Sequence, residues 1–210
     1  MTDEQLHIII SKEIGSEYPG DTRYYNAKCA MPSWPGGESG VTIGIGYDLG
    51  YNKREQIRKD WEGKVNSNIL VFILSVAGVK GELAKKMITE PARRMRIPYE
   101  VAKDVFLKST LPRFTKLAND TYPGLNKLND TTQAVIIGLV YNRGASFGEE
   151  GKPSWDSRKE MRELAPVILA GDYNKIAELI ESMSRLWVGK GMDGLVSRRK
   201  EEAELIKGSV

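Results

Sequence analysis

The chain has 210 residues, of which 40% are apolar and 28% charged. These values are ordinary for a soluble globular protein with a packed core and argue against a disordered chain. Lysine and arginine total 31 against 28 aspartates and glutamates, so the net charge is +3. This balance is compatible with an anionic polymer or a lipid headgroup surface and selects neither. The absence of a long basic run argues against a nucleic-acid-binding arm.

The sequence offers few residues for disulfide, thiol or metal chemistry. Cys29 is the only cysteine and His7 the only histidine. An intrachain disulfide is therefore excluded, and one histidine cannot build a histidine-based zinc site. A catalytic Cys–His pair is a weak alternative, because two single residues carry no family signature. We expect a protein that needs neither a metal nor an organic cofactor.

The first residues do not resemble a signal peptide, because the chain begins acidic and its apolar run is broken at Ser11, Lys12 and Glu13. The longest apolar stretch, around residues 69–79, is too short to cross a bilayer. We therefore expect a protein without a membrane span that is made and folded in the cytoplasm.

The first predicted element is a helix over residues 5–14. Leu6, Ile9, Ile10 and Glu13 fall on one side of it at helical spacing, so a carboxylate ends an apolar face. Glycines, prolines and aromatic residues then fill residues 15–40, which is typical of a long ordered loop. Residues 41–48 follow as a strand-like segment.

Helices are predicted along most of the remaining chain. The capping-box spacing of Asp130 and Gln133 marks one helix start, and Pro98 marks another. We predict an α+β, mostly helical fold in one domain of residues 1–210, with a loop and β lobe over about 15–52 and a helical lobe over about 53–210. The predicted helices cover residues 55–61, 66–77, 81–87, 99–119, 130–141, 159–170, 173–184 and 195–206.

The segment Gly-Val-Thr-Ile-Gly-Ile-Gly-Tyr-Asp at residues 40–48 carries the most chemical information. In an extended chain Thr42 and Asp48 share one face with two glycines between them. If the strand is straight, these two side chains lie about 20 Å apart. They meet at one centre only if the chain bends at Gly44 or Gly46, which glycine permits. A glycine-rich edge strand with a surface aspartate explains the pattern about equally well.

The carboxylate of Glu13 gives the segment a chemical interpretation. Cleavage of a glycosidic bond needs a proton donor and a second group that guides water or stabilises the transition state. A glutamate at the edge of an apolar face is favoured in its protonated form, as this chemistry requires. The alternative is a solvated residue at a helix end, which is common for a single glutamate.

Three stretches in order resemble the phage-type lysozymes of glycoside hydrolase family 24. The first is Thr-Ile-Gly-Ile-Gly at residues 42–46, preceded by a helix that ends in Glu13. The second is Gln-Ala-Val-Ile-Ile-Gly-Leu-Val-Tyr-Asn-Arg-Gly at 133–144. The third is Gly-Leu-Val-Ser-Arg-Arg-Lys-Glu-Glu-Ala-Glu-Leu at 194–205. Together they span residues 6–206, and the resemblance implies a lysozyme-like fold.

The resemblance also implies catalytic roles. Glu13 corresponds to the general acid, and Thr42 to the residue that orients the attacking water. Many members carry an aspartate a few residues before this threonine, but residues 35–40 contain none. In this respect the chain resembles the pesticin-like branch, in which the aspartate follows the threonine motif. This identifies Asp48 as the second carboxylate, with Glu38 as the alternative.

Four further residues match positions near the sugar cleft of the family. Tyr47 stands where many members have histidine, and Tyr141 and Asn142 match residues that bind the sugar. Arg198 matches an arginine near the catalytic glutamate, where it would stabilise the charged form. Three of the four also have a structural explanation: Tyr141 and Asn142 end a helix closed by Gly144, and Arg198 lies in a solvated helix.

The implied function is an N-acetylmuramidase, a lysozyme that hydrolyses the β-1,4 bond between N-acetylmuramic acid and N-acetylglucosamine in peptidoglycan. Its partners would be peptidoglycan glycan strands, and an immunity or delivery protein is an open alternative. We expect a monomer that reaches the periplasm through a holin or a secretion system, as a phage endolysin or an antibacterial effector. The family analogy favours an inverting mechanism. The alternatives are a chitosanase, a lytic transglycosylase and a non-catalytic wall-binding or partner-binding module.

Overall fold

The computed structural model describes residues 2–14 and 22–210. The chain divides into two compact units. The terminal unit consists of Met1–Lys12 and Arg113–Val210, and the central unit of Glu13–Pro112. The described residues are mostly helical and contain one two-stranded antiparallel sheet, which confirms the α+β, mostly helical prediction. The unit boundaries do not follow the predicted lobe boundary near residue 52, and the single catalytic domain stays a prediction.

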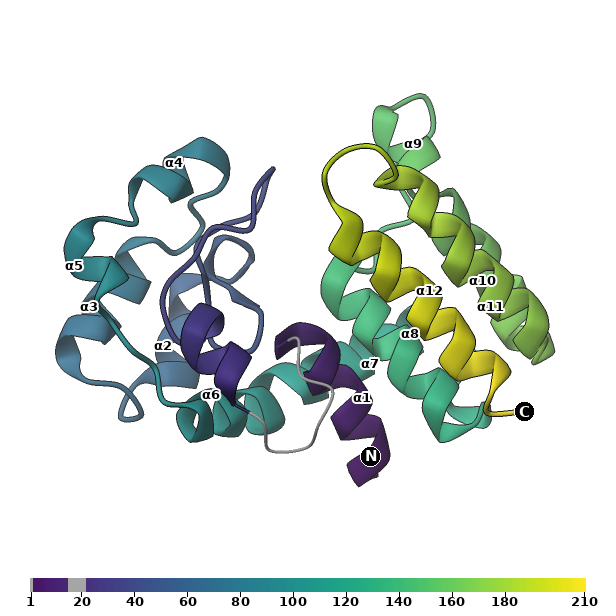
Figure 1. Ribbon diagram of the computed structural model, residues 1–210, viewed down its shortest axis with the longest axis horizontal. Coiled ribbons are helices and arrows are strands. Elements are labelled where there is room, and N and C mark those ends of the chain that lie inside the picture. Colours follow the sequence, from purple (N-terminus) through teal and green to yellow (C-terminus); the bar gives the residue numbers. More distant parts are fainter. Residues whose placement is uncertain (1, 15–21) are drawn as a thin grey trace. The chain divides into compact units, whose positions relative to one another are not determined.

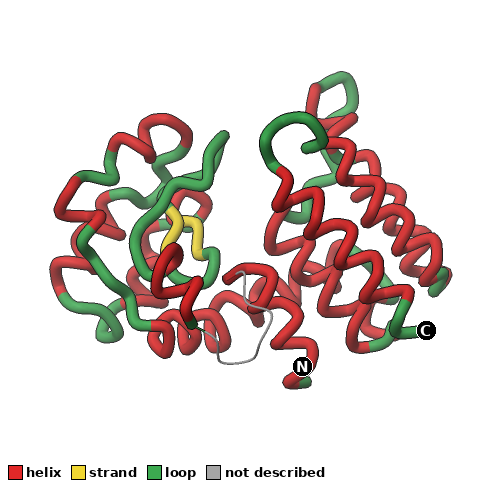
Figure 2. The backbone as a smooth tube through the Cα atoms, in the orientation of Figure 1, coloured by secondary structure: helices red, strands yellow, loops and turns green. Residues whose placement is uncertain are grey.

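The central unit contains the sheet and a set of short helices (Figure 2). Its core is built from large apolar side chains that are almost completely buried, including Tyr25, Leu49, Ile57, Trp61 and Ile73. The elements are η1 (Tyr25–Cys29), β1 (Thr42–Ile43), β2 (Tyr47–Asp48), η2 (Leu49–Tyr51), α2 (Arg54–Trp61), α3 (Ser67–Ser75), α4 (Gly81–Lys86), α5 (Glu90–Arg93), α6 (Tyr99–Val105) and η3 (Phe106–Thr110).

The terminal unit is a bundle in which α12 packs against α8 and α11, and α10 packs against α11 (Figure 1). Its core is apolar and includes most of α8, where every residue from Ala134 to Val140 is buried. The elements are α7 (Leu111–Thr121), η4 (Leu125–Lys127), α8 (Asp130–Arg143), α9 (Pro153–Ser157), α10 (Lys159–Ala170), α11 (Tyr173–Ser182), η5 (Met183–Leu186) and α12 (Asp193–Lys207). Helix α1 (Asp3–Ile14) runs across the boundary between the two units.

The predicted helices are all present, with bounds shifted by a few residues. The predicted helix over 99–119 is the one that differs in kind, because the π-helical turn η3 separates α6 from α7. Pro112 has no backbone N–H, so the carbonyl of Lys108 cannot form its usual helical hydrogen bond. A local widening of the helix is a common response to such a defect. Five short helices of the described residues, η1, η2, α5, η4 and α9, lie in segments where no helix was predicted.

The start of α8 differs from its predicted capping box. Asn129, one residue before the predicted cap Asp130, accepts a hydrogen bond from the backbone N–H of Thr132 at 2.9 Å. Gln133 donates to the carbonyl of Leu128 at 2.6 Å. Asn129 caps well because its backbone is extended while its side chain reaches the first turn. The other predicted start is confirmed, since α6 begins directly after Pro98.

Within residues 2–14 and 22–210, no helix is both long and apolar enough to cross a membrane.

Candidate functional site

The segment predicted as a strand over 41–48 is a tight antiparallel hairpin. Strands β1 and β2 pair with Thr42 opposite Asp48 and Ile43 opposite Tyr47. The chain turns through Gly44 and Gly46, whose φ angles are +60° and +66°. Such angles are readily adopted only by glycine. The bend that the sequence permits is therefore present, and a straight strand over 41–48 is excluded.

The hairpin brings Thr42 and Asp48 directly across from each other. The backbone N–H and carbonyl of Thr42 bond to Ser33 at 2.8 and 2.9 Å, on the side away from β2. Thr42 and Asp48 thus form a non-hydrogen-bonded pair, the closer kind, with Cα atoms typically about 4.5 Å apart. The predicted alternation is also present. Ile43 and Tyr47 are 1% and 3% exposed, whereas Thr42 and Asp48 are half-buried.

The carboxylate of Asp48 holds the backbone on both sides of the hairpin. Oδ1 accepts from the N–H of Gly50 at 2.8 Å, and both oxygens accept from the N–H of Gly40 at 3.1 Å. Burial raises the pKa of Asp48 above its usual value, while the bonds from Gly50 and Gly40 and the charge of Lys80 act in the opposite direction. Asp48 is therefore a structural clamp as well as a candidate catalytic group.

The clamp depends on two glycines that lie in close contact. A Cβ atom on Gly40 would lie 2.3 Å from the nitrogen of Gly50 and 2.5 Å from Oδ1 of Asp48. A Cβ on Gly50 would lie 2.7 Å from the Cα of Gly40 and from the carbonyl oxygen of Val79. The backbones approach too closely for any side chain, so both positions require glycine.

The hydroxyl of Thr42 is polar and buried. Its Oγ1 is shielded from solvent and has no hydrogen-bond partner among the described residues. A buried hydroxyl in a folded protein normally has a partner, so this group calls for an explanation. A hydroxyl can both donate and accept, which allows it to orient one small polar molecule.

Glu13, near the end of α1, belongs to the same neighbourhood as the hairpin. Its Oε1 is shielded from solvent. The Cys29 thiol has its pKa raised to about 11, first by burial and second by the negative charge of Glu13. The backbone carbonyl of Cys29 in turn accepts from the N–H of Gly44 at 3.2 Å. The charge of Glu13 thus acts on Cys29, whose backbone is bonded to the turn of the hairpin.

A buried network behind the hairpin was not predicted from the sequence. The hydroxyl of Tyr47 donates to Asp60 at 2.8 Å, and Gln56 donates to the other carboxylate oxygen of Asp60 at 2.8 Å. The Tyr47 ring also packs edge-on against Trp61, with centroids 5.4 Å apart. Asp60 is 1% exposed. Its position three residues after Ile57, on the apolar face of the predicted helix, was a signal that could have identified it.

Glu38, the alternative second carboxylate, lies on the surface. Its side chain is exposed, and its backbone carbonyl accepts from the hydroxyl of Tyr51 at 3.2 Å. Asp48 is therefore the carboxylate that faces Thr42 on the hairpin, and Glu38 lies in the loop before it.

The remaining predicted site residues belong to the terminal unit. Tyr141 and Asn142 lie in the last turn of α8, where the Tyr141 ring packs edge-on against Phe114 with centroids 4.8 Å apart and Asn142 is exposed. Arg198 on α12 is buried, which excludes the solvated helix position. It pairs with Glu202 at 2.9 Å and donates to the carbonyl of Lys12 at 3.4 Å.

The described part of the chain contains no group of three or more histidine, cysteine, aspartate or glutamate residues that could hold a metal ion.

The family described as a domain of unknown function (DUF8812) matches residues 12–121. The chain belongs to this family. The match includes the whole central unit and ends before α8. No curated protein matches the chain. The matched residues 12–121 include Glu13, Thr42, Tyr47 and Asp48 and leave out Tyr141, Asn142 and Arg198.

Proposed function

We propose that the protein is a muramidase with a lysozyme-like fold, which hydrolyses the β-1,4 bond between N-acetylmuramic acid and N-acetylglucosamine in peptidoglycan. Three stretches of the chain resemble phage-type lysozymes in the same order. The hairpin geometry supports the proposal, because it brings together two of the three residues to which the resemblance assigns the reaction. The substrate is the glycan strand of the bacterial wall, reached in the periplasm after delivery across the inner membrane.

In the proposed reaction Glu13 donates a proton to the oxygen of the leaving sugar. Water attacks the anomeric carbon and the bond to the leaving oxygen breaks, while one proton of the water passes to the second carboxylate, proposed to be Asp48. The Oε1 of Glu13 is shielded from bulk water, and a general acid must lie within hydrogen-bond reach of the oxygen that it protonates. The products are two shorter strands, one of which carries a new reducing end.

The observation that carries the proposal is the buried hydroxyl of Thr42. It lies on the half-buried face of the hairpin, opposite a carboxylate. A water bound between this hydroxyl and the substrate would have a fixed orientation. Positioning of this kind lowers the entropic part of the barrier. By the family analogy the water attacks with inversion.

Asp48 is proposed to serve the reaction in two ways. Its carboxylate fixes the hairpin through the N–H groups of Gly40 and Gly50, and its negative charge lies across from Thr42. Asp48→Asn should lose most activity, because an amide presents an N–H₂ donor where the carboxylate accepts from backbone donors. Glu38→Gln should lose little activity, because its side chain is exposed. A Glu38→Gln enzyme that is inactive beside an active Asp48→Asn enzyme would contradict this assignment.

The product of digestion distinguishes this proposal from its alternatives. Purified peptidoglycan is digested with the full chain and the fragments are analysed by mass spectrometry before and after borohydride reduction. We expect reducible N-acetylmuramic acid ends. Products with 1,6-anhydro ends would instead identify a lytic transglycosylase. Binding to the wall with no released fragment would identify a binding module, and cleavage of chitosan alone would identify a chitosanase.

A further inference from the structure

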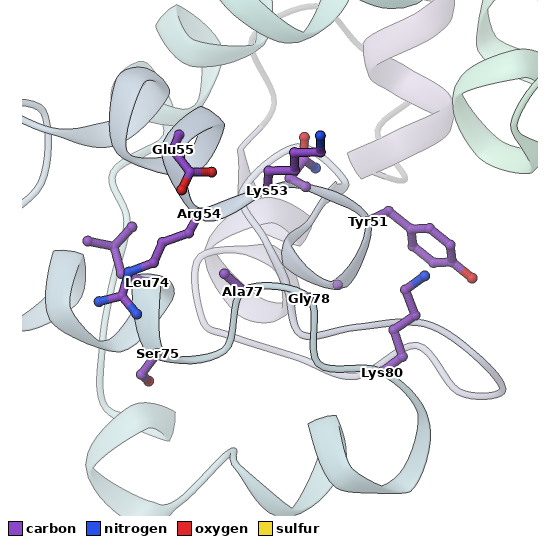
Figure 3. A pocket seen from close by; sticks show the side chains of 11 residues that line it. Tyr51, Lys53, Arg54, Glu55, Leu74, Ser75, Ala77, Gly78 and Lys80 are labelled. Carbon is purple, nitrogen blue, oxygen red and sulfur yellow. The ribbon is translucent and has the colours of Figure 1, made fainter.

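A pocket of about 460 Å³ lies on the central unit, beside the hairpin clamp. Its walls come from the segment after β2, the end of α3 and the loop that follows α3. Figure 3 shows Arg54 and Glu55 on one side of the pocket and Tyr51 and Lys80 on the other, with Ala77 between them. The volume falls within the usual range of ligand pockets, about 300–1,000 Å³. None of the proposed catalytic residues lines it.

The charged side chains of this pocket are predominantly positive. Lys53, Arg54 and Lys80 are three cations against the single carboxylate of Glu55, so the lining carries a charge of +2. Within the described part of the chain, neither Lys53 nor Arg54 takes part in an ion pair. All four side chains belong to exposed residues. The pocket therefore presents basic groups that an incoming anion can bind.

Lys80 is held in place by its neighbour. Its Nζ lies 3.7 Å from the centre of the Tyr51 ring, a cation–π contact that leaves the N–H groups of the ammonium available. The hydroxyl of Tyr51 donates to the carbonyl of Glu38 at 3.2 Å, which restrains the ring. A cation with a restrained position loses less entropy when it binds an anion.

The floor of the pocket is bare. Gly50, Ala77 and Gly78 line it, so backbone and one methyl group separate the basic residues on its two sides. Leu74 adds an apolar wall next to Arg54, as Figure 3 shows. The planar guanidinium of Arg54 matches the two oxygens of a carboxylate, and Glu55 can accept N–H donors of the same ligand.

From this arrangement we infer that the pocket binds an acidic peptide through its carboxylate, with Arg54, Lys53 and Lys80 as the positive partners. The carboxylate of Glu55 and the apolar wall favour a peptide over a simple phosphate, because a peptide brings N–H groups and methyl groups together with its negative charge. If the protein cleaves peptidoglycan, the peptide is the one attached to N-acetylmuramic acid. This identification of the peptide rests on the proposed function. The binding of an acidic peptide in the pocket does not.

Calorimetric titration of the full chain tests the inference with a short acidic peptide that ends in a free carboxylate. The same peptide with its carboxylates amidated is the matched ligand. We expect about tenfold weaker binding of the amidated peptide, since a hydrogen bond to a charged group contributes about 1.5–3 kcal/mol. Equal binding of both peptides would overturn the inference, as would inorganic phosphate that competes at the same concentration as the peptide.

Two double variants with the same change of charge locate the binding. Lys53→Gln with Arg54→Gln removes two cations from the pocket, and Lys86→Gln with Arg94→Gln removes two exposed cations that do not line it. The first pair should weaken binding of the free peptide at least about tenfold, and the second less than about twofold. An equal loss in both would mean that net charge alone attracts the peptide, and would overturn the inference.

The outcome does not depend on catalysis. Peptide binding is measured without any glycan, so it can succeed in a protein that cleaves no wall, and it can fail in an active muramidase. All four positions are exposed, so thermal unfolding of both double variants should match that of the wild type.

Discussion

The hairpin of the central unit and the charged cluster on α12 of the terminal unit bury different kinds of polar group. On α12, Arg198 and Arg199 share Oε1 of Glu202 at 2.9 and 2.8 Å, and the three side chains are 9%, 0% and 2% exposed. In the hairpin, the hydroxyl of Thr42 is buried with no hydrogen-bond partner among the described residues. The α12 side chains form ion pairs within the fold, whereas we propose that the Thr42 hydroxyl binds a water during the reaction.

Burial of arginine side chains in the terminal unit carries a desolvation cost. Arg143 has its pKa lowered to about 10, first by burial and then by the positive charges of Arg158 and Arg199. Its guanidinium also lies 5.0 Å from the Trp187 ring and donates to the carbonyl of Ser157 at 2.6 Å. These contacts compensate part of the desolvation cost.

The largest expected effect is on the stability of the terminal unit. Glu202→Gln removes the carboxylate that pairs with Arg198 and Arg199 and should lower the free energy of unfolding by about 3–5 kcal/mol. The matched control is Glu204→Gln on the same helix, whose carboxylate is exposed and pairs only with Lys207 among the described residues. It should change the free energy by less than about 1 kcal/mol. Urea denaturation measures both, and equal losses would contradict the structural role of the cluster.

The next largest expected effect is a loss of wall cleavage in a variant of Thr42 that keeps its stability. Thr42→Val keeps the shape of the side chain and removes the hydroxyl, so wall cleavage should fall about 10²–10³-fold. The melting temperature should not fall, because no hydrogen bond within the described residues is lost. Thr110→Val is the control, since the Thr110 hydroxyl is also buried without such a partner but lies in η3. Wild-type activity in Thr42→Val would contradict the proposed role of the Thr42 hydroxyl in the reaction.

The two regions also differ in how much of them follows from the sequence. Apolar periodicity predicts the helices of the terminal unit closely; the helix over Lys159–Ala170 has the predicted bounds. The hairpin could be anticipated only as a bend that Gly44 and Gly46 permit. The pattern alone could not predict the pairing of Thr42 with Asp48, because a straight glycine-rich strand has the same pattern.

Contacts between distant segments account for what the sequence did not reveal. The bond from Gly40 to Asp48 joins the segment before β1 to β2, and the bond from Tyr47 to Asp60 joins β2 to α2. Periodicity reports the face on which a residue lies and not the residue across from it. The separation of the chain into two units at Lys12 and Pro112 has no composition signal either, because both positions lie within helical runs.

A smaller effect tests whether Glu13 lies beside the hairpin. The pKa of Cys29 is raised from 9.0 to about 11, so at pH 8 its thiolate fraction is about 100-fold below that of an unperturbed thiol. Alkylation by iodoacetamide should be slower in proportion. Glu13→Gln removes a negative charge, lowers the pKa of Cys29 and should speed alkylation a few-fold, while Glu38→Gln should not change it. An unchanged rate in Glu13→Gln would contradict the proximity of Glu13 to Cys29.

The central claim is that Glu13 supplies the proton that breaks the glycan strand. The most direct measurement is the loss of turbidity of purified peptidoglycan with wild-type protein and Glu13→Gln side by side, with circular dichroism spectra of both. A general acid typically contributes about 10²–10⁴-fold to the rate. We expect clearing by the wild type, a loss of that size in Glu13→Gln, and identical spectra. Equal clearing by both proteins, or no clearing by the wild type, would contradict it.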